Sequence, residues 1–313
     1  MHILIKGLGW YGCHAAITLK SMGITFKICD ITNDFFTGSS SKNQNRLHQS
    51  FHYSRSYSTR KECCIGFNKF MEKYKQFTCE IPKNYYCVDK TSIIDYETYK
   101  AIYSYEKADF IEQEDFDLEF KCNKNMFDGI ITVNERFIDF RKAKQYFKEE
   151  LSEFMLDFNT YNENNYDMII DCTFTPITSN TFQEQCISLL YEYIGPKTNT
   201  FAITVMDGLF WSLYPYDIVN NIYTLTDVEF TPIGKESVKD DMELKVTKYI
   251  PDFDKHFIYK GCFYSHKIKS NNSKTDDRSL MYKIDNKILK FCGGKITGIF
   301  TMENILRDYF KTV

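Results

Sequence analysis

The sequence has no long uninterrupted apolar run, no excess of one charge and no internal repeat or low-complexity tract. Its apolar segments fall short of the ~20 residues that a membrane-spanning helix needs. The 39 basic and 42 acidic residues leave a net charge of -3, so the charge gives no reason to expect nucleic acid as a partner. We therefore predict a protein without a membrane span that does not bind nucleic acid.

The eleven cysteines form no metal-binding or redox motif. Their number is odd, their spacing is irregular, Cys63 and Cys64 are adjacent, and no C-x-x-C pair occurs. This pattern disfavours a zinc site and a thioredoxin-like centre, and we predict no metal. We expect most of the cysteines to be reduced, small apolar residues in a reducing compartment, the cytoplasm.

What the sequence does contain is typical of a folded globular protein. Its 313 residues are 43% hydrophobic and 17% aromatic, which suffices for a sizeable core. The length suits one large domain or two closely joined domains.

A glycine pattern at the N-terminus is the most informative feature. An apolar run over residues 2–6 leads directly into Gly7, Gly9 and Gly12, and Asp30 ends a second apolar run. The order of strand, glycines, helix, strand and acid predicts a dinucleotide site. Gly7 would make the turn, Gly9 would let a pyrophosphate approach the helix N-terminus, and Gly12 would let helix and strand pack closely. Asp30 would bind a ribose hydroxyl.

Periodicity predicts the elements that follow. Helical spacing covers residues 60–77, 137–154 and 296–310. Apolar runs predict strands at 85–88, 129–134, 166–173 and 287–291. Short β-rich runs predict an antiparallel sheet at 187–193, 200–206, 210–214 and 222–226. Polar composition predicts loops at 37–46 and 267–277.

Three separated segments carry a resemblance to a known family. The first is the glycine pattern with its acidic partner, and the second is residues 40–53, where Asn43, His48 and Tyr53 have the family's spacing but Ser50 replaces a common glycine. The third is the Gly-Gly-Lys turn of residues 291–297, which precedes a helix. Together they resemble the FAD-dependent oxidoreductases of the D-amino-acid oxidase type, especially the L-2-hydroxyglutarate and glycerol-3-phosphate dehydrogenase branches.

The resemblance implies an α/β (α+β) fold, with a Rossmann-like FAD-binding domain and an antiparallel β-sheet substrate domain. Residues 1–80, 130–180 and 285–313 would form the first domain, and 81–129 and 181–284 the second. Residues 171–173, Asp-Cys-Thr, occupy the place of the family's usual Ala-Thr-Gly. The residues implied to bind FAD are Gly7, Gly9, Trp10, Tyr11, Gly12, Asp30, Ser40, Ser41, Asn43, Arg46, Cys172, Thr173, Gly293, Gly294, Lys295, Ile296 and Thr297.

Oxidation of an amine or alcohol also requires an acceptor for the N–H or O–H proton. His48 and His52 lie four residues apart beside the predicted flavin loop, and a neutral histidine suits this role. Each could instead only bond to backbone in a polar loop. Some relatives attach the flavin covalently to a histidine in this region, so His48 is also a candidate attachment point. Cys292, beside the predicted turn, is a weaker candidate for such a link than for a packed thiol.

Other side chains are candidates for holding the substrate. Arg46 could bind an anionic substrate or offset charge on the reduced flavin, and Arg55 and Arg278 are weaker candidates that fit surface positions as well. Tyr214 and Tyr216 fall on one face of a strand and could present their hydroxyls together. The alternative for both tyrosines is packing in the core.

The sequence therefore predicts a FAD-dependent oxidase or dehydrogenase that transfers hydride from a small polar substrate to flavin N5. An amino acid, an amino sugar and a 2-hydroxy acid all fit as substrates, and the electron acceptor is oxygen or another compound. An NAD(P)-dependent reductase and a non-catalytic FAD-binding protein remain alternatives.

Overall fold

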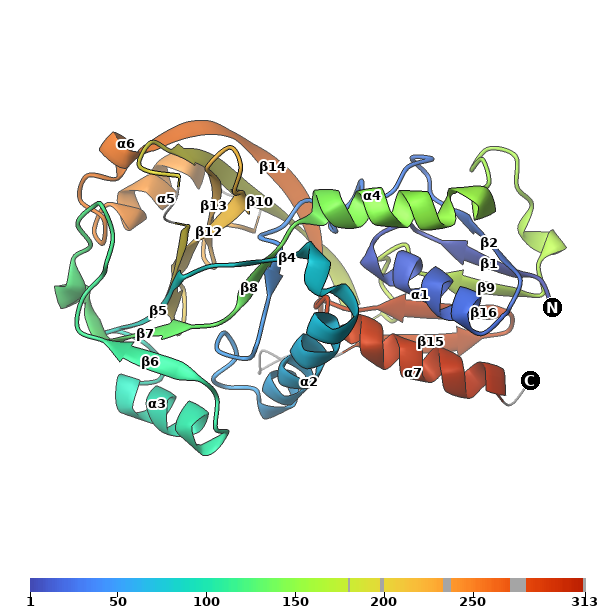
Figure 1. The fold of residues 1–313 in the computed structure, drawn as a ribbon, viewed down its shortest axis with the longest axis horizontal. Helices are drawn as coiled ribbons and strands as arrows, with labels where there is room; N and C mark the ends of the chain where they lie inside the picture. Colours follow the sequence, from blue (N-terminus) through green and yellow to red (C-terminus); the bar gives the residue numbers. More distant parts are fainter. Residues whose placement is uncertain (180, 198–199, 233–237, 271–279, 312–313) are drawn as a thin grey trace.

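Two large β-sheets organise the chain in the computed structural model, which describes residues 1–179, 181–197, 200–232, 238–270 and 280–311. The smaller of the two has five strands in the order β15-β16-β9-β1-β2 (Figure 1). All neighbours are parallel except β15 and β16. Its strands are β1 (Ile3–Lys6), β2 (Phe26–Cys29), β9 (Met168–Asp171), β15 (Met281–Asp285) and β16 (Ile288–Cys292).

The central strand β1 is apolar because it is covered on both faces. Its Ile5 lies in register with Ile28 of β2 and Ile170 of β9. Parallel pairing brings the carboxyl ends of these strands to one edge of the sheet, where α/β proteins bind their ligands.

Four helices belong to this half of the molecule: α1 (Trp10–Ser21), α2 (Tyr57–Tyr74), α4 (Phe140–Leu151) and α7 (Gly298–Lys311). Figure 1 shows α1, α4 and α7 gathered around the five-stranded sheet. Ser56 is the N-cap of α2, and its side chain accepts a hydrogen bond from the Thr59 N–H. Asp139 is the N-cap of α4, and its side chain accepts hydrogen bonds from two backbone N–H groups of the first turn. The Trp10 side chain fills the core between them, with five aromatic ring centroids 5.1–6.3 Å away.

The larger sheet has eight strands in the order β14-β10-β13-β12-β11-β5-β7-β6. They are β5 (Lys83–Asp89), β6 (Phe110–Gln113), β7 (Phe127–Val133), β10 (Thr181–Tyr193), β11 (Phe201–Met206), β12 (Trp211–Asp217), β13 (Ile222–Asp227) and β14 (Phe257–Ser270). The predicted antiparallel pairing is present between β10 and β13, between β13 and β12, and between β12 and β11. One pair differs, because β11 runs parallel to β5.

A third sheet has three strands in the order β3 (Arg46–Leu47), β8 (Arg136–Ile138) and β4 (Thr78–Glu80). The remaining elements are α3 (Tyr96–Tyr105), α5 (Val238–Val246), α6 (Phe253–His256), η1 (Lys75–Phe77), η2 (Lys124–Met126), η3 (Ser152–Phe154) and η4 (Glu163–Asn165). No helix in the described ranges is both long and apolar enough to cross a bilayer.

The structure corrects one predicted loop, and two strands lie across the proposed domain boundaries. Residues 267–270 are not a loop, because they continue β14 in pairing with β10; residues 271–279, including Arg278, lie outside the described residues. Strand β7 crosses the proposed boundary at 129/130, since it pairs with β5 and β6 along its length. Strand β15 similarly joins the five-stranded sheet before residue 285. The division into two domains stays a prediction.

A buried histidine joins the first and last helices. His14 is fully buried, with Nδ1 2.8 Å from Tyr74 Oη and Nε2 2.9 Å from Glu303 Oε2. Because a carboxylate only accepts, Nε2 donates to Glu303 and Nδ1 accepts from Tyr74. Burial lowers the pKa of His14 from 6.5 to about 4, although the Glu303 hydrogen bond opposes this shift.

This histidine predicts acid sensitivity of the fold. Its folded-state pKa is below the unfolded value, so the unfolded chain binds more protons between these values and stability falls as the pH drops from 6.5 towards 4. We expect a loss of roughly 3 kcal/mol over this range. Melting curves of the wild type and of His14→Phe test this: the variant should have a flatter dependence of melting temperature on pH. Equal slopes would contradict the assignment.

Candidate active site

A cavity of about 920 Å³ lies where the carboxyl ends of β1, β2 and β9 face the larger sheet. It brings together all three segments that the sequence singled out. The predicted residues that line it are Gly7, Gly9, Trp10, Tyr11, Asp30, Ser40, Asn43, Arg46, His48, His52, Cys172, Thr173, Gly293, Gly294, Lys295, Ile296 and Thr297. Gly12, Ser41, Tyr214 and Tyr216 do not line it, and Cys292 is a buried thiol beside it.

The glycine turn has the close contacts that the sequence predicts. Gly7 has a φ of +91°, and a Cβ there would lie 2.7 Å from the Cys172 carbonyl oxygen. A Cβ on Gly12 would lie 1.8 Å from the Gly7 carbonyl oxygen, so Gly12 permits the tight packing of α1 on β1. Gly9 faces the cavity, with the Ser40 hydroxyl only 2.5 Å from the position of a Cβ.

The N-terminus of α1 is suited to an anion. Its first turn has no acidic residue, and its N-cap Gly9 has no side chain to bond to the free N–H groups. Ser40 Oγ accepts from the Trp10 N–H at 3.0 Å, so the 40–53 segment begins directly at this helix end. Backbone N–H groups and the helix dipole together favour a pyrophosphate there.

Asp30 ends β2 at the edge of the cavity. Its Oδ2 accepts from the Leu8 N–H at 2.9 Å, and its Oδ1 accepts from the Thr32 N–H and hydroxyl. These bonds fix the carboxylate beside the glycine turn, where it retains lone pairs for a further donor. Binding of a ribose hydroxyl by Asp30 stays a prediction.

The C-terminal turn is tied to the glycine motif by Tyr11. The Tyr11 hydroxyl donates to the Lys295 carbonyl oxygen at 2.6 Å. A Cβ on Gly293 would lie 2.0 Å from this hydroxyl and one on Gly298 2.3 Å from it. The small residues of the turn therefore make room for a side chain that joins the two ends of the chain.

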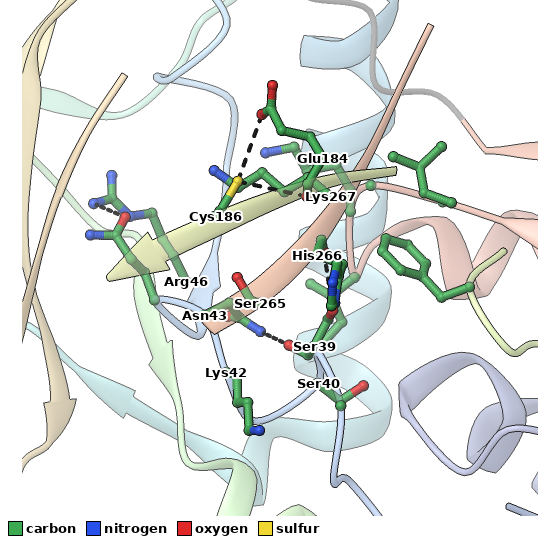
Figure 2. A pocket seen from close by; sticks show the side chains of 18 of the residues that line it. Ser39, Ser40, Lys42, Asn43, Arg46, Glu184, Cys186, Ser265, His266 and Lys267 are labelled. Atoms are coloured by element: carbon green, nitrogen blue, oxygen red, sulfur yellow. Dashed lines mark hydrogen bonds between the residues drawn. The ribbon is translucent and has the colours of Figure 1, made fainter. Parts of the chain in front are cut away.

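The loop of residues 39–46 lies opposite β10 and β14 of the larger sheet. Figure 2 shows Ser39, Ser40 and Asn43 opposite Cys186 of β10 and His266 of β14. Asn43 donates to the Ser39 carbonyl and accepts from the Asn45 N–H, and Ser39 Oγ donates to the His266 carbonyl at 3.1 Å. These bonds close one wall of the cavity.

The backbone conformation of Ser50 explains why glycine is common at this position in the family that the sequence resembles. It has a φ of 156°, a conformation that costs an L-residue free energy but not glycine. Its carbonyl accepts from the Tyr53 N–H at 2.9 Å and from the Tyr103 hydroxyl at 3.3 Å, so the loop keeps its shape despite the side chain.

His48 and His52 lie together at the wall of the cavity. Their ring centroids are 5.3 Å apart, and both rings pack edge-on against Tyr53. Burial lowers the pKa of His48 well below its ordinary value, and the positive charges of Lys295 and Arg46 lower it further. Burial, and then His48 and Arg46, lower the pKa of His52 in the same direction. Both imidazoles are therefore neutral near pH 7.

Lys295 provides a cation beside these rings. Its Nζ lies 4.0 Å from the centroid of the Tyr53 ring, and no carboxylate in the described part of the chain forms an ion pair with it. Burial and the charge of Arg46 lower the pKa of Lys295 to about 7.

Lys295 should make anion binding in this cavity depend on pH. Because its charge is present below the pKa and lost above it, we expect acetate to bind more weakly as the pH rises through about 7. Lys295→Met should bind acetate weakly at every pH. Acetate-induced changes in the visible spectrum, titrated between pH 6 and 8.5, measure both dissociation constants. A pH-independent constant in the wild type would contradict this role.

Arg46 is buried, and most of its donors are engaged. One terminal nitrogen donates to Thr204 Oγ1 at 2.7 Å and to the Tyr86 hydroxyl at 3.0 Å, and the other contacts Gln44 Oε1 at 3.5 Å. The guanidinium lies 4.0 Å from the centroid of the Tyr214 ring. Arg55, also at the cavity, forms a 2.7 Å ion pair with Asp207.

Tyr214 and Tyr216 are corrections to the predicted site. Their hydroxyls donate to the Arg136 and Ser41 carbonyls, both at 3.1 Å, instead of facing the cavity. The pairing of β12 with β13 shifts register between Pro215 and Asp217, so strand alternation is interrupted at Tyr216. Tyr214 lies behind Arg46, and Tyr216 anchors the loop.

Several residues of the site carried no signal in the sequence. Glu135 is completely buried between β7 and β8, where its Oε2 lies 3.6 Å from His48 Nδ1 and accepts from Tyr86 at 2.6 Å. Thr204, Ser212 and Thr226 form a row of hydroxyls across three neighbouring strands at the cavity wall, in direct register. No local motif marks these positions, because the sheet pairing alone brings them together.

Buried polar atoms around the cavity indicate a polar ligand. Arg46 Nε, His48 Nδ1, His52 Nδ1 and Trp211 Nε1 have no hydrogen-bond partner among the described residues, although all four residues line the cavity. Buried polar groups without partners cost free energy and usually mark a site of function. A helix end suited to an anion, a glycine that permits close approach and buried polar groups in the same cavity together fit a dinucleotide.

Comparison with known proteins gives relatives along nearly the whole chain, although no protein-family model matches it. The chain is 30% identical over 331 residues to the FAD-dependent monooxygenase FPY4 of Fusarium mangiferae, covering 95% of this chain and 87% of that protein. It is 23% identical over 360 residues to the FAD-dependent monooxygenase kojA of Aspergillus flavus, covering 96% and 83%.

Solved structures share the fold. Glycine oxidase from Geobacillus kaustophilus superposes with a TM-score of 0.72 at 9% identity, over 98% of this chain and 93% of that chain. FAD-bound L-alpha-glycerophosphate oxidase from Mycoplasma pneumoniae gives a TM-score of 0.71 at 13% identity, over 98% and 92%.

Proposed function

Because the chain belongs to the FAD-dependent oxidoreductases with the D-amino-acid oxidase type of fold, we propose that it oxidises a small, neutral, polar hydroxy compound or amine. The observation that carries this proposal is the arrangement of the far end of the FAD cavity. There two neutral histidines lie beside a row of hydroxyl groups, and the neighbouring guanidinium groups already bond to the protein.

The glycine turn and the N-terminus of α1 would hold the pyrophosphate of FAD, and the C-terminal turn would lie against the cofactor. The isoalloxazine end would then lie near His48, His52 and Lys295. Bound FAD supplies a hydride acceptor, which removes two electrons and one hydrogen from a substrate carbon. The chain must then take the remaining O–H or N–H proton, and His48, neutral and at the cavity surface, is suited to accept it.

The bonds that the two guanidinium groups already make favour a neutral substrate over a carboxylate. Arg46 would have to break its hydrogen bonds to Tyr86 and Thr204 before it could bind a carboxylate in a bidentate way. Arg55 would have to break its bond to Asp207. Thr204, Ser212 and Thr226 instead offer hydroxyls that both donate and accept. A compound with several hydroxyl groups, including an amino sugar, matches such a wall.

Matched substrate pairs test this preference. 1,2-Propanediol against lactate, and glycerol against glycerate, differ mainly in the carboxylate. Mixed anaerobically with the holoenzyme, the neutral member of a pair should bleach the flavin absorbance, and the acid should do so at least about tenfold more slowly. Faster bleaching by the acids would overturn the neutral-substrate proposal.

The names of the sequence relatives raise a second candidate, oxygen insertion. A monooxygenase places one oxygen atom in its substrate, reduces the other to water and needs two electrons from an external reductant. An oxidase releases one hydrogen peroxide per substrate oxidised. Measuring peroxide yield and NAD(P)H consumption with a reactive substrate separates the two: peroxide without NAD(P)H use supports our proposal, and coupled NAD(P)H use replaces it.

A further inference from the structure

Glu135 lies at one end of a buried chain of donors that starts at Arg46. Arg46 donates to the Tyr86 hydroxyl at 3.0 Å, and this hydroxyl donates to Glu135 Oε2 at 2.6 Å. The other oxygen, Oε1, accepts from the Gln49 N–H at 2.7 Å and more weakly from the Ser50 N–H at 3.4 Å. The carboxylate is thereby fixed without direct contact with the cavity.

The Nδ1 edge of His48 faces this carboxylate. Nδ1 lies 3.6 Å from Glu135 Oε2, is itself buried and has no hydrogen-bond partner in the described structure. This distance is longer than a hydrogen bond, but such contacts commonly shorten when substrate binds. Because His48 lines the cavity, the opposite Nε2 edge is the one available to a substrate.

We propose that Glu135 is a positioning residue that holds His48 in the tautomer with the proton on Nδ1, and stabilises the imidazolium that forms when Nε2 takes the substrate proton. This inference deepens the proposed function and rests on His48 being its proton acceptor. The step is a simple transfer: the substrate O–H or N–H bond breaks, and an N–H bond forms at Nε2. The substrate's other hydrogen leaves as hydride, so charge balances.

The surroundings of His48 explain why such a partner is needed. Lys295 and Arg46 oppose a positive charge on the ring, as does burial, and His52 is a neutral neighbour 5.3 Å away. Glu135 is the negative group that faces the ring among the described residues. Without it, the transient imidazolium would form in a buried site beside the positive charges of Lys295 and Arg46.

The tautomer of His48 gives a test that does not depend on turnover. We would record the 15N chemical shifts of the histidine side chains in the wild type and in Glu135→Gln at pH 7.5, assigning His48 from His48→Gln. The wild type should carry the proton on Nδ1. In Glu135→Gln the amide can donate to Nδ1, so the proton should move to Nε2. A wild-type His48 with the proton on Nε2 overturns the proposal, even if Glu135→Gln does not fold.

Kinetics provide the second readout. Flavin reduction by the preferred substrate should slow about 10- to 100-fold in Glu135→Gln, mainly in kcat, and Glu135→Asp should recover part of it. Asp89→Asn is the matched control, because Asp89 is also a buried carboxylate that accepts from a tyrosine hydroxyl, that of Tyr249, but lies away from the cavity. It should change neither the His48 shifts nor the reduction rate.

The outcomes separate this inference from the proposed function. If His48 keeps its Nδ1 proton in Glu135→Gln and the reduction rate is unchanged, the positioning role of Glu135 is wrong. The proposed function would not be affected by that result. Loss of the Nδ1 tautomer in the variant together with a normal reduction rate in His48→Gln would instead show that the contact exists but that His48 is not the proton acceptor.

Discussion

Replacing Gly9 by valine should weaken FAD binding strongly and leave the fold intact. A Cβ at this position would lie 2.5 Å from the Ser40 hydroxyl, a side-chain atom that can move, and Gly9 has an ordinary φ of -83°. The branched side chain would nevertheless fill the space in front of the N-terminus of α1, where the pyrophosphate approaches. We expect FAD affinity to fall by more than about 100-fold, which corresponds to about 2.7 kcal/mol.

Gly12→Ala is the informative contrast for this variant. Its Cβ would lie 1.8 Å from a backbone atom, the Gly7 carbonyl oxygen, so α1 would have to move away from β1. We expect a loss of stability of about 3 kcal/mol or more, visible in the apoprotein without FAD. Melting temperatures and the flavin content after incubation with FAD distinguish the two effects. Normal flavin content in Gly9→Val would refute the placement of the pyrophosphate.

The second large effect concerns His48. In His48→Ala, the holoenzyme should fold and bind FAD, but flavin reduction by substrate should slow on the order of 10²- to 10⁴-fold, the usual contribution of a general base. His2→Ala is the control, because His2 is exposed and does not line the cavity. Stopped-flow absorbance under anaerobic conditions measures the rate directly.

Other results of this experiment would also be decisive. An unchanged reduction rate would return His48 to a purely structural role. If the wild type held its flavin through acid precipitation and His48→Ala did not, the residue would be the covalent attachment point instead.

The turns expected to hold the cofactor could be located from the sequence because their signals are local. A turn with φ above zero and a helix packed on a strand demand glycine at Gly7 and Gly12 wherever the rest of the chain lies. The Gly-Gly-Lys turn is equally local, and small residues were needed there because Tyr11 from the far end of the sequence fills the space.

The substrate end of the site was less predictable because it is assembled by long-range pairing. Glu135 reaches the Gln49 N–H across 86 residues, and only the arrangement of β3 and β8 brings them together. Tyr214 and Tyr216 were misplaced for a related reason: strand alternation does not reveal the register shift beside Tyr216, nor the contacts of the two hydroxyls with the Arg136 and Ser41 carbonyls.

The visible absorption spectrum of the purified protein, before and after acid precipitation, tests the central claim most directly. Residues of all three predicted cofactor-binding segments line one cavity, so we expect about one FAD per chain. The purified protein should show the corresponding flavin bands or, if it is colourless, should take up about one added FAD. A colourless protein that takes up no added FAD would contradict the account.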